Sequence, residues 1–129
     1  MDKDKVYTDG HRVVNDLAKL AHRNARKHGF YDDVELTQGV LFAQGAHAAH
    51  RNATRDFVLA QLAKIASEVG ETVSAIQHDL SDEAIVTELA DVCIRAFDLA
   101  EYIGVPIGTA IVKKMRVNEA RPYKHGKSC

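Results

Sequence analysis

Residues 54–76, TRDFVLAQLAKIASEVGETVSAI, carry the clearest helical pattern of this chain. Thr54 is a typical N-cap, and Asp56 adds an acid to the first turn, where the helix dipole favours negative charge. Apolar residues then recur every three or four positions, at Val58, Leu62, Ile65, Val69, Val73 and Ile76. This spacing places them in one stripe of a helix and predicts that the stripe faces the protein core.

The same periodicity returns after a short turn, in residues 81–103. Ser81 is the expected N-cap and Gly104 the expected end of this helix. Its apolar stripe consists of Ile85, Leu89, Val92, Ala96, Leu99 and Ile103. Two long helices joined by a short turn predict an antiparallel helical hairpin. Because one hairpin makes a thin core, we expect oligomerisation, as a homodimer or homotetramer, to complete a four-helix bundle.

The remaining segments fit a single all-α domain over residues 1–129. A further helix is expected at 10–27, and a shorter one from Pro106, which suits a first helical turn. Residues 30–52 show no sustained period and are interpreted as a long loop that can include a helical turn or two around 38–42. Residues 119–129 are interpreted as a polar, basic tail.

Bulk composition excludes several classes of protein. The formal net charge is −1, so no global positive field attracts nucleic acid. No apolar run is long enough to cross a membrane, and the charged N-terminus lacks the apolar core of a signal peptide. Cys93 and Cys129 are interpreted as free thiols in a reducing compartment. We therefore expect a cytoplasmic protein with no membrane or nucleic-acid partner.

Two pairs of acids stand beside the apolar stripes of the hairpin. Glu68 and Glu71 are neighbours on one helix, and Glu88 and Asp91 on the other, because residues three apart share a helix face. Glu88 lies nearest its own stripe, roughly 60° from its centre, and is expected to be the most shielded of the four. In an antiparallel hairpin the two pairs can face each other.

Converging carboxylates repel one another and lose hydration, so a cation must compensate them. Mg²⁺ or Mn²⁺ does so with oxygen ligands and leaves coordination positions for water and phosphates. The alternative is an exposed face decorated by local ion pairs, Lys64 with Glu68 and Asp91 with Arg95, each four residues apart.

The acid pattern resembles a known signature. An E-x-x-E motif, sixteen further residues and an E-x-x-D motif are similar to the metal-binding signature of the MazG-like nucleoside triphosphate pyrophosphohydrolases. SEVGETVSAI, ELADVCIRAFDLAEYIGV and KKMRVNEARPYKHGK also resemble that family, over about 62–127. The resemblance implies hydrolysis of a (d)NTP to the (d)NMP and pyrophosphate, in control of the nucleotide pool, with Mg²⁺ or Mn²⁺ as cofactor.

The resemblance also implies roles for individual residues. Glu68, Glu71, Glu88 and Asp91 would hold the metal, and one of the three glutamates would orient the attacking water. The residues that match the family's C-terminal pattern would contact phosphate and sugar, in the same or a neighbouring subunit: Lys114, Asn118, Arg121, Tyr123 and Lys124. Arginine and lysine suit phosphate oxygens chemically; a disordered basic tail is the alternative.

Residues between Asp33 and Thr54 do not align with the family, and base recognition is expected there, so the resemblance leaves the substrate open. Phe30 and Tyr31 either stack on a base or anchor their segment on the core. The HGFYD pattern resembles short single-domain members of phages and bacteria, which include the MazZ branch. Similarity to that branch implies guanine nucleotides as substrates and, for a phage protein, the host cytoplasm as location.

Other functions fit the same sequence. The chain can be a non-catalytic helical dimerisation module, or the same fold can act on dUTP or phosphoribosyl-ATP. His47 and His50 have a spacing suited to zinc, but no third ligand lies near them in the sequence, so we interpret them as ordinary polar residues.

Overall fold

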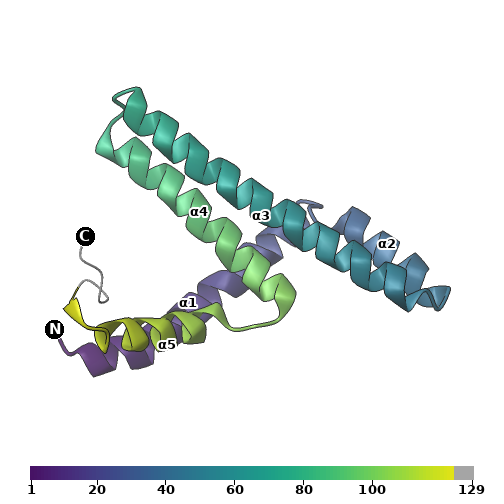
Figure 1. The fold of residues 1–129 in the computed structure, drawn as a ribbon, viewed down its shortest axis with the longest axis horizontal. Helices are drawn as coiled ribbons and strands as arrows, with labels where there is room; N and C mark the ends of the chain where they lie inside the picture. Colours follow the sequence, from purple (N-terminus) through teal and green to yellow (C-terminus); the bar gives the residue numbers. More distant parts are fainter. Residues whose placement is uncertain (124–129) are drawn as a thin grey trace.

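Two antiparallel helices, α3 (His47–Gln77) and α4 (Asp82–Ile103), form the hairpin that the sequence predicts (Figure 1). The computed structural model describes residues 1–123, and all regular structure in that part of the chain is helical. The other helices are α1 (Lys3–Lys27), α2 (Asp32–Ala43) and α5 (Ile107–Glu119). The all-α class is therefore confirmed, whereas completion of a bundle by another copy stays a prediction.

The ends of α4 follow the expected capping chemistry. The Ser81 side chain accepts a hydrogen bond from the Ala84 backbone N–H at 3.2 Å. Gly104 ends the helix in the left-handed conformation, with φ of 86°, which glycine adopts without strain. Both signals are local, which is why the sequence alone placed this helix correctly.

Helix α1 crosses α4, and α5 runs alongside α1 (Figure 1). Small side chains, Ala18 and Ala25, are buried on α1, so its backbone lies close to its neighbours. Gly108 has the same effect on α5, because a Cβ there would collide with the His11 carbonyl oxygen. α1 also begins earlier than predicted, at Lys3 instead of Gly10, because Asp2 caps it.

The predicted long loop at 30–52 is wrong. The segment contains α2, a short turn with Gly45 in the left-handed region, and the first turns of α3, which begins well before Thr54. α2 has no buried residue, and its apolar side chains are spread around the helix. The sequence therefore shows no apolar stripe from which this helix could be predicted. Its acidic first turn and the Gln38 amide, which donates to Thr54 and Tyr102, stabilise it against the rest of the fold.

The prediction about which face of α3 is buried is also wrong. Most of the apolar stripe is exposed, for example Val69 at 48% and Val73 at 50%, and the buried residues are instead Glu68, Thr72 and Ala75. α4 packs against this second face, so residues 1–123 leave most of the stripe uncovered. No helix described within residues 1–123 has the length and apolarity needed to cross a membrane.

Candidate functional site

Three acids meet between the two helices of the hairpin. Glu68 and Glu71 come from α3 and Glu88 from α4, and each offers a carboxylate oxygen within 4.8 Å of the other two. The three-residue spacing on α3 puts its two acids on one side, and the antiparallel packing brings α4 against that side. The three carboxylates can therefore hold a metal ion together.

The order of shielding differs from the sequence-based expectation. Glu68 is the buried member of the group, Glu88 is half-buried and Glu71 is exposed. Glu88 was expected to be the most shielded because it lies nearest its own stripe. Glu68 is buried instead because α3 turns its acidic face, and not its apolar stripe, toward α4.

Electrostatic repulsion among the carboxylates shifts the pKa of Glu71. The negative charge of Glu68 is the largest cause that raises the pKa of Glu71, followed by a hydrogen bond between the two side chains. The charge of Glu88 acts in the same direction, and that of Arg95 opposes it. A cation shared by the acids would relieve this repulsion, and an all-oxygen donor set of this kind suits a hard divalent ion.

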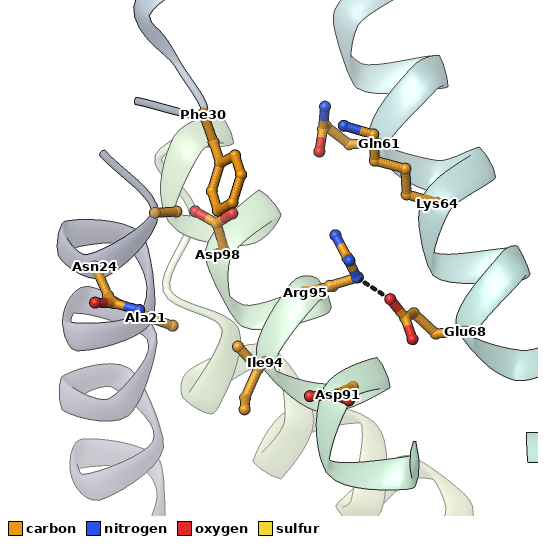
Figure 2. A pocket seen from close by; sticks show the side chains of 11 residues that line it. Ala21, Asn24, Phe30, Gln61, Lys64, Glu68, Asp91, Ile94, Arg95 and Asp98 are labelled. Atoms are coloured by element: carbon orange, nitrogen blue, oxygen red, sulfur yellow. Dashed lines mark hydrogen bonds and ion pairs between the residues drawn. The ribbon is translucent and has the colours of Figure 1, made fainter. Parts of the chain in front are cut away.

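Arg95 of α4 reaches across the hairpin to Glu68 (Figure 2). Its Nε lies 2.5 Å from Glu68 Oε1. Within residues 1–123, the two local pairs that would mark a simple exposed face, Lys64 with Glu68 and Asp91 with Arg95, are not formed. The acids are thus tied to a contact between helices instead of local pairs along one helix.

The fourth acid, Asp91, is placed differently. Its side chain is exposed and lies outside the group of three acids found within residues 1–123. It does line the pocket beside Glu68 (Figure 2). Its role as a metal ligand therefore stays a prediction.

A pocket of about 350 Å³ opens next to the acids. Glu68 and Asp91 line one part of it, and Lys64 and Arg95 supply positive charge. Phe30, Asn24 and Asp98 line the part away from the acids (Figure 2). The pocket thus passes from negative charge through positive charge to an aromatic ring.

The structure separates the two adjacent aromatics whose roles the sequence left open. Tyr31 is 2% exposed, stacks on Tyr102 with ring centroids 5.2 Å apart, and donates to Asp98 Oδ1 at 2.7 Å. Burial is the main cause that raises the pKa of its phenol. Phe30 is 70% exposed and lines the pocket. Tyr31 is therefore the anchor, and Phe30 is available to a ligand.

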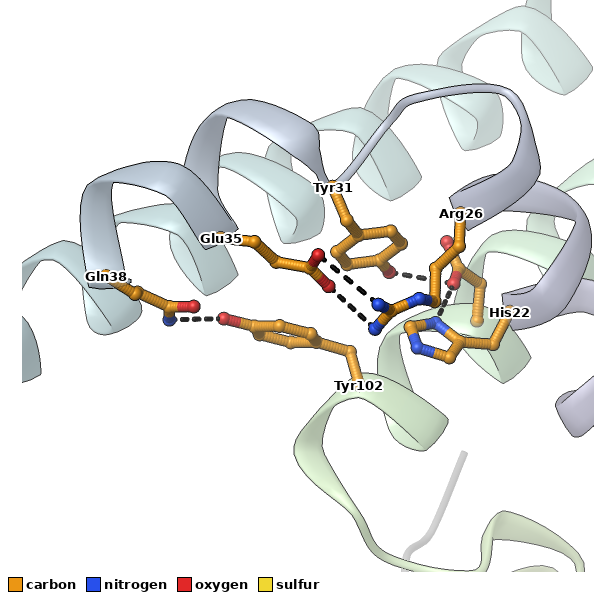
Figure 3. Close-up of polar contacts among 7 residues, drawn as sticks. His22, Arg26, Tyr31, Glu35, Gln38 and Tyr102 are labelled. Carbon is orange, nitrogen blue, oxygen red and sulfur yellow. Dashed lines mark hydrogen bonds and ion pairs between the residues drawn. The ribbon is translucent and has the colours of Figure 1, made fainter. Parts of the chain in front are cut away.

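A polar network behind the pocket was not found from the sequence (Figure 3). His22 Nδ1 lies 2.8 Å from the same Asp98 Oδ1 that Tyr31 contacts, and Arg26 pairs with Glu35 at 2.6 Å. Most of these partners come from different helices far apart in the chain, so no spacing rule connects them. The hydrogen bonds from His22 and Tyr31 hold Asp98 at a fixed position in the pocket wall.

Four of the five predicted phosphate and sugar contacts lie within residues 1–123, and none of these four lies at this pocket. Lys114 and Asn118 belong to α5, and Arg121 and Tyr123 follow it. α5 packs on α1, and none of these four residues lines the pocket. Lys124 lies outside the described residues. Their roles stay predictions.

The two histidines considered for zinc lie at the start of α3. Both have ring contacts with Phe42, and neither belongs to a cluster of potential ligands within the described part of the chain.

The fold and the site define an all-α protein with a three-carboxylate cluster and an adjoining pocket. Part of the chain is distantly similar to the dATP/dGTP diphosphohydrolase of Cyanophage S-2L, with 38% identity over 63 residues. The match covers 48% of this chain and 54% of that protein, so about half of each is compared. No family model and no solved structure matches the chain.

Proposed function

We propose that this protein is a metal-dependent nucleotide pyrophosphohydrolase that converts a (d)NTP to the (d)NMP and pyrophosphate. The meeting of Glu68, Glu71 and Glu88 between antiparallel helices carries the proposal. The pocket beside them adds positive charge and an aromatic ring, which a nucleotide requires. Partial similarity to a dATP/dGTP diphosphohydrolase supports the same chemistry.

Glu68, Glu71 and Glu88 would hold Mg²⁺ or Mn²⁺, with Asp91 joining from the edge of the pocket. The bound metal would neutralise phosphate charge and activate a water for attack at phosphorus. The Glu68 carboxylate is buried and held by packing, while that of Glu71 is exposed to solvent water. One of these glutamates would orient the water.

The residues that line the pocket suggest how a bound nucleotide would be oriented. Lys64 and Arg95 would contact the phosphates near the acids, since both are cations in the pocket wall. Phe30 would stack on the base, because an exposed aromatic ring offers a flat surface to any base.

Asp98 would accept hydrogen bonds from the base. His22 and Tyr31 both bind Oδ1, and no described residue forms a hydrogen bond or ion pair with Oδ2. A fixed carboxylate favours a base edge with N–H donors, which guanine provides at two adjacent positions. We therefore propose dGTP or GTP as the preferred substrate, in agreement with the MazZ-like wording of the sequence.

We further propose that the protein works as a homodimer or homotetramer. The uncovered stripe of α3 and the exposed apolar residues of α1, such as Leu17 and Leu20, are surface that a second copy would bury. Assembly would also allow the C-terminal residues of one copy to reach a neighbour's pocket: Lys114, Asn118, Arg121, Tyr123 and Lys124.

Val69→Asp should disrupt this assembly. A charge buried in an apolar interface without a partner should weaken association by about a hundredfold or more. Light scattering over a concentration series would show a shift to monomer. Ala63→Asp is the matched control, because this exposed position lies on the same helix, roughly 120° round from the stripe. Equal masses for both variants and the wild type would contradict the role of the stripe.

The function is tested with a panel of nucleotides. The purified protein is incubated with Mg²⁺ or Mn²⁺ and each dNTP, dUTP, GTP and phosphoribosyl-ATP, and the products are separated by ion exchange. Release of monophosphate and pyrophosphate, abolished by a chelator and restored by Mg²⁺, is the expected result. If only dUTP or phosphoribosyl-ATP is hydrolysed, the proposed reaction stands but the proposed guanine nucleotide substrate is wrong. Absence of turnover with every nucleotide would favour a non-catalytic dimerisation module.

A further inference from the structure

Arg95 is the positive charge that compensates the most buried acid of the cluster. It comes from α4, one turn beyond Asp91, and its Nε lies 2.5 Å from Glu68 Oε1. The Glu68 side chain is 12% exposed and that of Arg95 is 45% exposed. The carboxylate is therefore held in place, while the guanidinium retains access to solvent and to the pocket.

The compensation that Arg95 provides is incomplete. One positive charge faces three carboxylates that lie within 4.8 Å of one another, and within residues 1–123 Arg95 forms an ion pair with Glu68 alone. A divalent cation brings twice the charge and can bind oxygens of all three acids at once. Arg95 and such a cation compete for the same carboxylate. The Glu68 side chain is mostly buried, so it has little exposed surface at which a cation could bind without displacing Arg95.

The pocket offers Arg95 a second partner. Arg95 and Lys64 both line it, and Arg95 lies between Glu68 and Asp98 in Figure 2. A phosphate group bound beside a metal at the acids would lie within the space that these two cations border. A guanidinium pairs with phosphate through the same fork of N–H donors that it uses for carboxylate.

We propose that Arg95 exchanges partners: it binds Glu68 in the metal-free protein, releases it when a divalent cation takes the carboxylate, and then contacts the substrate phosphates. This inference rests on the proposed function, since it assumes the metal and the nucleotide. It makes metal and nucleotide binding mutually dependent, because each favours the same position of Arg95. Arg95 is then more than a structural ion pair.

Arg95→Gln should change the two affinities in opposite directions. Removing the competitor should tighten Mn²⁺ binding in the absence of nucleotide by about fivefold or more. Loss of a phosphate contact should weaken binding of a non-hydrolysable dGTP analogue, in the presence of Mn²⁺, by about tenfold. Isothermal titration calorimetry measures both on the whole protein, with circular dichroism to compare the folds.

Lys64→Gln is the matched control, because Lys64 lines the same pocket but pairs with no acid in the described structure. It should weaken the analogue in a similar way and change Mn²⁺ affinity by less than about twofold. Unchanged or weakened Mn²⁺ binding in Arg95→Gln would overturn the exchange and leave Arg95 as a support for Glu68. An equal gain in Mn²⁺ affinity in both variants would also overturn the exchange, because the loss of any nearby positive charge would then explain the gain.

A measurement on the wild type avoids dependence on the folding of a variant. The Nε–H group of Arg95 should give a distinct NMR resonance while it donates to Glu68, and titration with diamagnetic Mg²⁺ should move it. A resonance that stays fixed while Mg²⁺ saturates the acids would overturn the exchange. If the wild type binds neither Mg²⁺ nor Mn²⁺, the proposed function fails with it. Normal turnover with no response of Arg95 would overturn this inference alone.

Discussion

Glu68→Gln should lower the rate of dNTP hydrolysis by about a thousandfold, the largest effect expected of any single substitution here. Glu68 is the buried member of the acid cluster and shares its position with Glu71 and Glu88. An amide removes the negative charge but keeps the shape, so the helices should stay in register. Mn²⁺ affinity, measured by calorimetry, should fall by at least about tenfold.

The same substitution has an effect that can be measured without metal or substrate. The charge of Glu68 is the main cause of the raised pKa of Glu71, so this pKa should fall toward its ordinary value of 4.5 in Glu68→Gln. A raised pKa means that the folded protein holds its proton more tightly than the unfolded chain, so the metal-free wild type loses stability as pH rises above that ordinary value. The variant should lose less, and NMR titration of Glu71 together with unfolding at several pH values tests both statements.

Glu83→Gln is the control for this prediction, because Glu83 is an exposed acid in the first turn of α4 and lies outside the cluster. This variant should retain activity. Its free energy of unfolding should fall by only a few tenths of a kcal/mol, because one favourable charge near the N-terminus of the helix dipole is lost. Full activity in Glu68→Gln would remove Glu68 from the proposed metal site.

Phe30→Ala should raise the KM for dGTP by about fivefold to a hundredfold, because stacking on an aromatic ring contributes about 1–3 kcal/mol per base. Phe30 is exposed and lines the pocket, so its loss should hardly change the free energy of unfolding. Binding of inorganic triphosphate, which has no base, should be unchanged, and competition assays with this ion separate the two contributions.

Its neighbour provides the converse control. Tyr31→Phe keeps the ring but removes the hydrogen bond to Asp98, so it should lower the free energy of unfolding by about 1.5–3 kcal/mol. Chemical denaturation measures this loss. A KM for dGTP that is unchanged in Phe30→Ala would show that the base lies elsewhere. An equal loss of stability in both variants would show that Phe30 also anchors the chain.

The similarity to the cyanophage protein covers only about half of each chain. The residues of the proposed base site come from α1, the α1–α2 turn and α4. Base preference is thus the part of the proposal that depends most on geometry. The contrast between Phe30 and Tyr31 shows why: the two are adjacent in sequence, and one is 70% and the other 2% exposed.

Local signals account for the parts of the fold that were predicted well. The Ser81 cap and the Gly104 end placed α4, and the three-residue spacing placed Glu68 beside Glu71. Helix α2 was missed because it lacks an apolar stripe and depends on contacts such as that of Gln38 with Tyr102. Such contacts join residues that no local rule relates.

The sequence by itself determined the all-α class, the hairpin, and the two pairs of acids one helical turn apart, because these follow from the geometry of a single helix. Only the tertiary structure decided that α3 turns Glu68 and not its apolar stripe toward α4, that Glu68, Glu71 and Glu88 converge, and that Arg95 pairs across the hairpin. These features depend on which face each helix presents to its neighbours. In this chain, α3 has one face against α4 and another, more apolar face that no part of residues 1–123 covers completely.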